Sequence, residues 1–132
     1  MSDLILLDTS VWIETFRRRN PLHLEKIAEF ERVVTCLPVI QEVLQGFRDE
    51  GAFRIARDAM LALPAVESPL SLSVVEEAVG LYRAARRQGL TIRSSVDCLI
   101  AACALRHRLT VFHRDRDYPL LAKVSALQQR TV

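Results

Sequence analysis

Leu4-Ile5-Leu6-Leu7-Asp8-Thr9-Ser10 is the stretch that decides the fold of this chain. Four consecutive apolar residues followed by an acid and two hydroxyl residues are typical of a buried strand that ends at a polar edge and leads into a helix. Ligands of open α/β sheets bind outside the carboxyl ends of the strands, so Asp8 stands where a functional side chain is expected. Asp is also a preferred N-cap residue, and this segment alone leaves capping and chemistry as equal alternatives for Asp8.

The length and composition predict one domain that covers residues 1–132, with 50% hydrophobic residues to build its core. Neither an apolar run of about 20 residues nor a basic-then-apolar N-terminus is present, so we expect a cytoplasmic protein with no membrane segment. The three cysteines are odd in number and lack C-x-x-C spacing, which argues against a disulfide framework and a thiolate zinc site.

The net charge of +2 is too small to indicate a nucleic-acid partner by itself. Of the 18 basic residues, all but Lys26 and Lys123 are arginine, whose planar fork suits phosphate recognition. The arginine clusters at residues 17–19, 86–87 and 114–116 are available for phosphate contacts, although each is equally consistent with a solvated face.

Short β-branched apolar segments predict further strands at residues 33–36 and 109–112, with a weaker candidate at 65–67. Helices are expected between the strands, at about residues 10–19, 21–31, 38–47, 51–63, 71–88, 94–107 and 120–124. The helix at 71–88 is expected to begin with a Ser73-x-x-Glu76 capping box and to end at Gly89. This alternation predicts an α/β fold.

Acids occur at the start or end of several of these elements. Asp97 precedes an entirely apolar run at residues 98–105, which predicts a helix buried on all sides. An acid in the first turn of a helix also favours the helix dipole, so Asp97 has a purely structural alternative. Asp115 and Asp117 follow the strand at 109–112, and Asp117 is in position to stabilise the next helix at its N-terminus, whereas His113 looks incidental.

Glu42 lies almost opposite an apolar helical stripe formed by Ile40, Val43, Leu44 and Phe47. Its position is therefore that of a solvated side chain or of a residue on the wall of a cleft.

Three or four carboxylates at one sheet edge repel one another, which raises their pKa values unless a cation neutralises them. Oxygen ligands suit Mg²⁺ or Mn²⁺, which activate water for attack at phosphorus in nucleases and phosphatases. The sequence lacks phosphate-binding glycine loops and the G-x-S-x-G elbow of serine hydrolases. A phosphatase that forms an aspartyl-phosphate would need Asp at position 10, where this chain has Ser10.

Four motifs together resemble PIN-domain ribonucleases in order and spacing, over nearly the whole chain. The motifs are Leu7-Asp8-Thr9-Ser10, Pro38-x-x-x-Glu42-x-x-x-Gly46, Ser95-x-Asp97-x-x-Ile100-Ala101-Ala102 and Asp115-x-Asp117-Tyr118. The size is similar to that of the VapC toxin subunits of toxin-antitoxin pairs. The resemblance implies a three-layer α/β/α sandwich with a central parallel sheet, a Mg²⁺- or Mn²⁺-dependent endoribonuclease site, an RNA substrate, a homodimer, and a VapB-like antitoxin partner.

The resemblance also implies roles for individual residues. The acidic quartet, catalytic and metal-binding, corresponds to Asp8, Glu42, Asp97 and Asp115, with Asp117 as the alternative fourth acid and Ser10 as a substrate or water contact. His113 stands where relatives often have Thr or Ser, and Tyr118 where Phe is commoner. The remaining alternatives are a non-catalytic binding module of the same fold, or another metal-dependent nuclease or phosphatase.

Overall fold

The strand predicted at the start of the chain is the centre of the sheet. In the computed structural model, which describes residues 3–132, β1 (Ile5–Leu7) lies between β2 (Val33–Cys36) and β4 (Thr110–His113). The edges of this five-stranded sheet are β3 (Ala65–Val66) and β5 (Gln128–Thr131), and every neighbouring pair is parallel. In this order, β3-β2-β1-β4-β5, the chain reverses direction across the sheet at β1, between β2 and β4.

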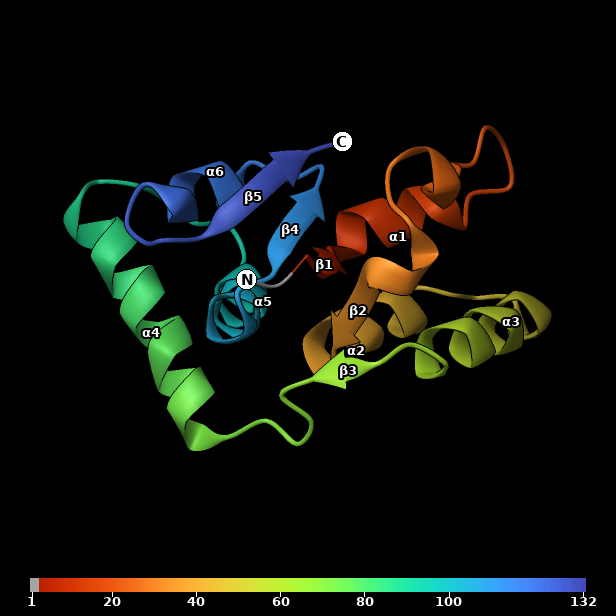
Figure 1. Cartoon of the computed structure of the whole chain (residues 1–132), viewed down its shortest axis with the longest axis horizontal. Helices are drawn as coiled ribbons and strands as arrows, with labels where there is room; N and C mark the ends of the chain where they lie inside the picture. Colours follow the sequence, from red (N-terminus) through yellow and green to blue (C-terminus); the bar gives the residue numbers. More distant parts are fainter. Residues whose placement is uncertain (1–2) are drawn as a thin grey trace.

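Helices cover both faces of the sheet. Figure 1 shows α4 and α5 on one side of the strands and α1 and α3 on the other, which confirms the predicted three-layer α/β/α sandwich. The helices are α1 (Thr9–Thr15), α2 (Leu37–Gln45), α3 (Glu50–Leu61), α4 (Leu72–Arg87), α5 (Ser95–His107) and α6 (Asp117–Ala122), and two 3-10 turns are η1 (Leu24–Lys26) and η2 (Phe30–Arg32).

The core lies where β1 and α5 meet the surrounding elements. All three residues of β1 are buried, as expected for a strand with a neighbour on each side and helices on both faces. In α5 the run from Ile100 to Ala104 is fully buried, and its small side chains allow close packing against the adjacent α4. The prediction of a helix without a solvated face is confirmed, and α5 therefore holds its N-terminal residues in a fixed position.

Two of the predicted helices differ from those in the structure. The helix expected at residues 21–31 is replaced by η1 and η2. Neither turn contains a fully buried residue and Phe30 is 62% exposed, so packing provides little support for one continuous helix. The first helix ends at Thr15 instead of near residue 19.

Two further expectations differ from the structure. The capping box at Ser73 is wrong, since Ser71 is the N-cap of α4 and its hydroxyl accepts the Val74 N–H. β5 was not expected, because its sequence, Gln128–Thr131, is polar and mostly exposed, as an edge strand can be. Gly89 follows α4 with φ of +73°, in agreement with its predicted role at the helix end.

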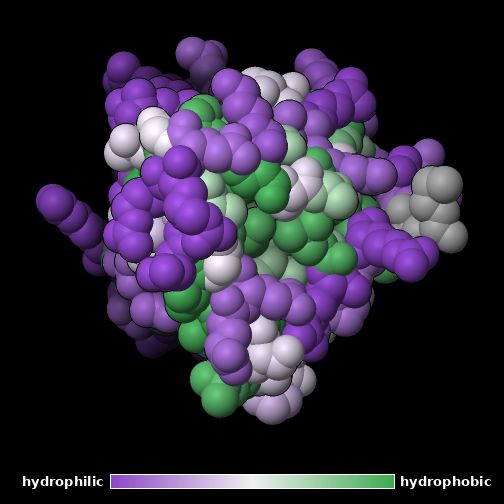
Figure 2. Space-filling view, turned by 90° about the vertical axis from the view of Figure 1, so that its left-hand side faces the viewer, coloured by the Kyte–Doolittle hydropathy of each residue, from purple (hydrophilic) through white to green (hydrophobic). Residues whose placement is uncertain are grey.

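The outer face of α4 leaves apolar side chains in contact with solvent. Leu72 is 74% exposed and Val79 is 53% exposed. Figure 2 views the molecule from this side and shows hydrophobic residues gathered in the middle of a hydrophilic surround. Within residues 3–132, no helix combines the length and the apolar content needed to cross a bilayer.

Candidate metal centre

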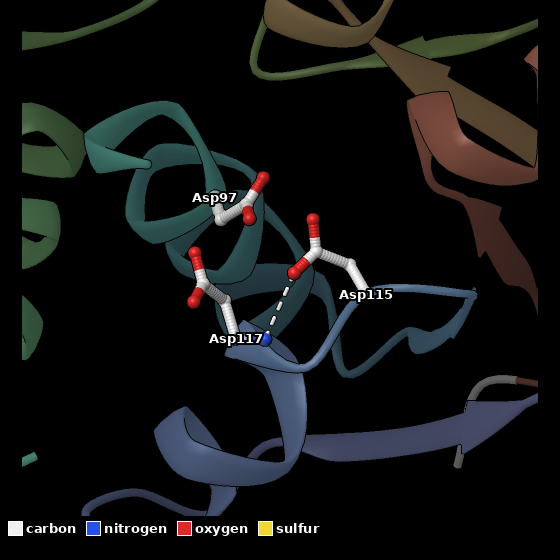
Figure 3. Close-up of side chains that lie close together, drawn as sticks. All are labelled: Asp97, Asp115 and Asp117. Atoms are coloured by element: carbon white, nitrogen blue, oxygen red, sulfur yellow. Dashed lines mark hydrogen bonds between the residues drawn. The ribbon is translucent and has the colours of Figure 1, made fainter. Parts of the chain in front are cut away.

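The acids predicted from separate parts of the chain lie near one edge of the sheet. Asp97, from the first turn of α5, faces Asp115 and Asp117, which follow β4 (Figure 3). Each of these three residues offers one carboxylate oxygen, and the three oxygens all lie within 4.8 Å of one another. The three acids therefore lie outside the carboxyl ends of the strands, near the reversal of strand order at β1, which is where α/β sheets bind ligands.

Asp8 caps α1 and also lies next to the acidic cluster. Its Oδ2 accepts the backbone N–H of Ser10 at 3.0 Å and the Ser10 hydroxyl at 2.6 Å, so the capping alternative is correct. Its Oδ1 accepts the hydroxyl of Tyr118 at 2.5 Å, and the same hydroxyl lies 3.4 Å from Asp97 Oδ1. One phenol oxygen therefore separates Asp8 from Asp97, and capping does not exclude a role in the site.

The surroundings of Asp97 strongly disfavour its ionised form. Only 4% of the residue is exposed, and its Oδ2 has no hydrogen-bond partner among residues 3–132. Burial raises the pKa of Asp97 to about 9, with further contributions from the adjacent Asp117 carboxyl and from the charges of Asp8 and Asp115. A buried oxygen without a donor, among other acids, is an arrangement that a cation would satisfy.

Asp115 and Asp117 have different surroundings, although only one residue separates them. Both oxygens of the buried Asp117 accept backbone N–H groups, from Arg93 at 3.1 Å and from Ser94 at 3.0 Å. Asp115 is half-buried, and its Oδ1 accepts the Asp117 N–H at 2.9 Å, drawn as a dashed line in Figure 3. Asp117 thus stabilises the start of α5, the neighbouring helix, in addition to lying at the start of α6.

Glu42 and Ser10 lie outside the cluster of three carboxylates. Glu42 is half-buried on α2, and its Oε1 accepts the Thr9 hydroxyl at 2.8 Å. It lines a small cavity together with Val96, the residue before Asp97. The Ser10 hydroxyl donates its one proton to Asp8 and accepts the Arg114 N–H at 3.0 Å, so it joins the end of β1 to the loop after β4.

Two residues of the site were not foreseen from the sequence. Tyr118 is fully buried, and His113 is buried beside it with a ring-centroid distance of 4.9 Å. His113 Nδ1 accepts the Asp115 N–H at 3.1 Å, so its Nε2 carries the proton and donates to Gln129 Oε1 at 2.6 Å. His113 is therefore not incidental, because it supports the loop that carries Asp115. The only sequence signal was that both residues depart from the family pattern.

The donor set fits a hard divalent cation. The cluster supplies carboxylate oxygens, which Mg²⁺ and Mn²⁺ prefer, and both nitrogens of the nearby His113 are already engaged. Asp97 Oδ2, which no donor among residues 3–132 contacts, is an oxygen that such a cation would accept as a ligand. The fold and the site together define an α/β/α protein with a cluster of carboxylates, suited to a cation, at the end of a parallel sheet.

Comparison with known proteins agrees with this class. The family model described as "PIN domain" matches residues 5–125. Ribonuclease VapC11 of Mycobacterium tuberculosis is 36% identical over 130 residues, which span 95% of this chain and 96% of the relative. Ribonuclease VapC51 of the same organism is 32% identical over 120 residues, or 91% and 86% of the two chains. The chain therefore belongs to the PIN domain family.

Solved structures show the same fold. The VapBC-5 structure from Mycobacterium tuberculosis aligns with a TM-score of 0.73 and 20% identity, over 98% of each chain. The VapBC-1 structure from nontypeable Haemophilus influenzae aligns with a TM-score of 0.74 and 15% identity, over 97% of each chain. The similarity covers the sheet and the surrounding helices almost completely.

Proposed function

We propose that this protein is an endoribonuclease that depends on Mg²⁺ or Mn²⁺ and acts in the cytoplasm as the toxin of a toxin-antitoxin pair. The observation that carries the proposal is the cluster of Asp97, Asp115 and Asp117, with a buried Asp97 oxygen that has no partner among the described residues. The ribonuclease names of its relatives support the reaction and the RNA substrate.

Individual residues take different parts in this proposal. Asp97 and Asp115 would hold the ion directly, since each retains an oxygen for which the described residues provide no hydrogen-bond donor. Asp8, held by Ser10 and Tyr118, would complete the ligand set from the opposite side of the phenol oxygen. Asp117 would act mainly as a support, because its two oxygens hold the backbone N–H groups at the start of α5, and its remaining lone pairs keep it as the alternative fourth acid. Glu42 would contribute from α2 across the small cavity that it lines.

When bound, the ion would supply charge stabilisation at phosphorus and an activated water. The surrounding chain would bind and orient the RNA strand. Arg93, Arg114 and Arg116 are exposed next to the acidic cluster, and their guanidinium groups suit phosphate oxygens. Phosphate contacts from these residues would offset the negative charge that the carboxylates present to an approaching RNA.

The proposal includes two protein partners. Two solved structures with a similar fold are those of VapBC proteins, and this similarity supports a VapB-like antitoxin as a partner of this chain. The exposed apolar residues on the outer face of α4, such as Leu72 and Val79, support association with a second copy to form a homodimer.

Induced expression in a bacterial host tests the proposed toxin role. We expect the wild-type protein to arrest growth and the Asp97→Asn variant, produced at the same level, to leave growth unchanged. Co-expression of a small DNA-binding protein encoded beside this gene should restore growth. Normal growth with folded wild-type protein present would contradict the toxin role.

A further inference from the structure

The hydroxyl of Tyr118 lies between two acids that come from opposite parts of the chain. It is 2.5 Å from Oδ1 of Asp8, at the end of β1, and 3.4 Å from Oδ1 of Asp97, in α5. Tyr118 itself is fully buried in the first turn of α6. The side chain is shielded from solvent, and its hydroxyl contacts these two acids.

The hydrogen bonds fix the direction in which this proton points. A phenol has one proton to donate, and the shorter distance assigns it to Asp8. The other oxygen of Asp8 accepts the Ser10 N–H and hydroxyl. Asp8 therefore has donors on both oxygens, and its carboxylate plane is held from two sides.

We propose that Tyr118 is a positioning residue of the metal centre: its hydroxyl holds Asp8 in the orientation in which Asp8 and Asp97 can share one ion. This inference rests on the proposed function. A carboxylate oxygen has a second lone pair, so Asp8 Oδ1 can accept the phenol proton and still act as a ligand. Groups that hydrogen-bond to ligating side chains typically contribute about 10–100-fold to metal affinity.

The ring of Tyr118 has a separate packing role. It lies against the His113 ring and fills space in the core, and a phenylalanine would do the same. The Tyr118→Phe substitution therefore removes only the hydroxyl and separates positioning from packing.

Manganese affinity, measured by titration calorimetry on the full-length protein, tests the proposal. We expect Tyr118→Phe to weaken Mn²⁺ binding by about 10-fold or more. The matched control is Tyr82→Phe, on α4. Tyr82 is 37% exposed, Arg86 lies over its ring, and its hydroxyl makes no described hydrogen bond to the acids, so this variant should bind Mn²⁺ as the wild type does. Thermal unfolding with chelator present would verify that both variants are folded.

A double-mutant cycle with Asp8→Asn distinguishes action through Asp8 from a general effect. If Tyr118 acts through Asp8, Tyr118→Phe should change Mn²⁺ affinity less than 2-fold in the Asp8→Asn background. Equal Mn²⁺ affinity of Tyr118→Phe and wild type, or fully additive effects in the cycle, would overturn the positioning role while leaving the metal centre intact. A wild-type protein that binds no Mn²⁺ would overturn the proposed function as well.

Discussion

The carboxylate of Asp117 accepts the backbone N–H of Ser94 at 3.0 Å and so joins the first residue of α6 to the N-cap of α5. Its second oxygen accepts the Arg93 N–H. We therefore expect Asp117→Asn to destabilise the protein by about 1–3 kcal/mol, because an amide NH₂ would face one of these N–H groups. Thermal unfolding with chelator present measures the effect.

Asp115→Asn is the matched comparison for Asp117→Asn. Its Oδ1 would still accept the Asp117 N–H, so the stability should change by less than about 0.5 kcal/mol. RNA cleavage should nevertheless fall by at least about 100-fold, since the oxygen available to the ion is lost. Full cleavage by Asp115→Asn, together with a stable but inactive Asp117→Asn, would reverse the assignment of the fourth acid.

The metal-free site should limit the stability of the protein. At pH 8 the metal-free folded protein holds Asp97 as a buried acid close to other acids, which is unfavourable. An amide at this position carries no charge and could donate a hydrogen bond to the neighbouring Asp117. We expect Asp97→Asn to raise the melting temperature with chelator present by about 4 °C, equivalent to about 1 kcal/mol in a domain of this size. A lower melting temperature for this variant would show that Asp97 is structurally required.

The raised pKa of Asp97, about 9, makes the stability of the metal-free protein depend on pH. In the unfolded chain Asp titrates near about 3.9, so between these values the folded state binds more protons. The contribution of Asp97 to the free energy of unfolding is therefore fully present below about pH 3.9 and is lost as the pH rises towards 9. With chelator present, the melting temperature should fall between pH 6 and pH 8.5 more steeply for wild type than for Asp97→Asn.

Metal binding should show the opposite pH dependence. Only the ionised form of Asp97 binds a cation, so Mn²⁺ affinity should increase with pH through the same range. Titrations at pH 6.5 and pH 8.5 measure this increase, and equal affinity at the two values would contradict the involvement of Asp97.

The Ser10 hydroxyl should contribute to stability as well as to the site. It donates to Asp8 at 2.6 Å and accepts the Arg114 N–H at 3.0 Å. Ser10→Ala removes both bonds and should cost about 1–2 kcal/mol in unfolding free energy. Ser10→Thr retains the hydroxyl and should recover most of the loss. An unchanged stability of Ser10→Ala would leave the predicted substrate or water contact as the main role of this residue.

The elements that carry the acids could be predicted because their signals are local. Apolar runs before Asp8 and around residues 98–105 mark buried elements, and the acids at their ends share a sheet edge in any parallel α/β arrangement. The edge strand β5 could not be found this way, since its polar residues are mostly exposed and pair only with β4.

The site's internal hydrogen bonds depend on contacts between distant residues. Tyr118 and Asp8 are 110 positions apart, and His113 meets Gln129 through the pairing of β4 with β5. The hydrophobic periodicity of the sequence does not reveal contacts between residues so far apart. The distinction between Asp115 and Asp117 likewise depends on which of them meets the loop before α5, which the sequence did not indicate.

The most direct test of the central claim is cleavage of a mixed RNA pool by the purified protein, with Mg²⁺ or Mn²⁺ compared with excess chelator. We expect metal-dependent cleavage by the wild type and its loss in both Asp8→Asn and Asp97→Asn, with the two variants still folded. Cleavage that persists in chelator or in the Asp97→Asn variant would contradict a carboxylate metal centre at the end of this sheet.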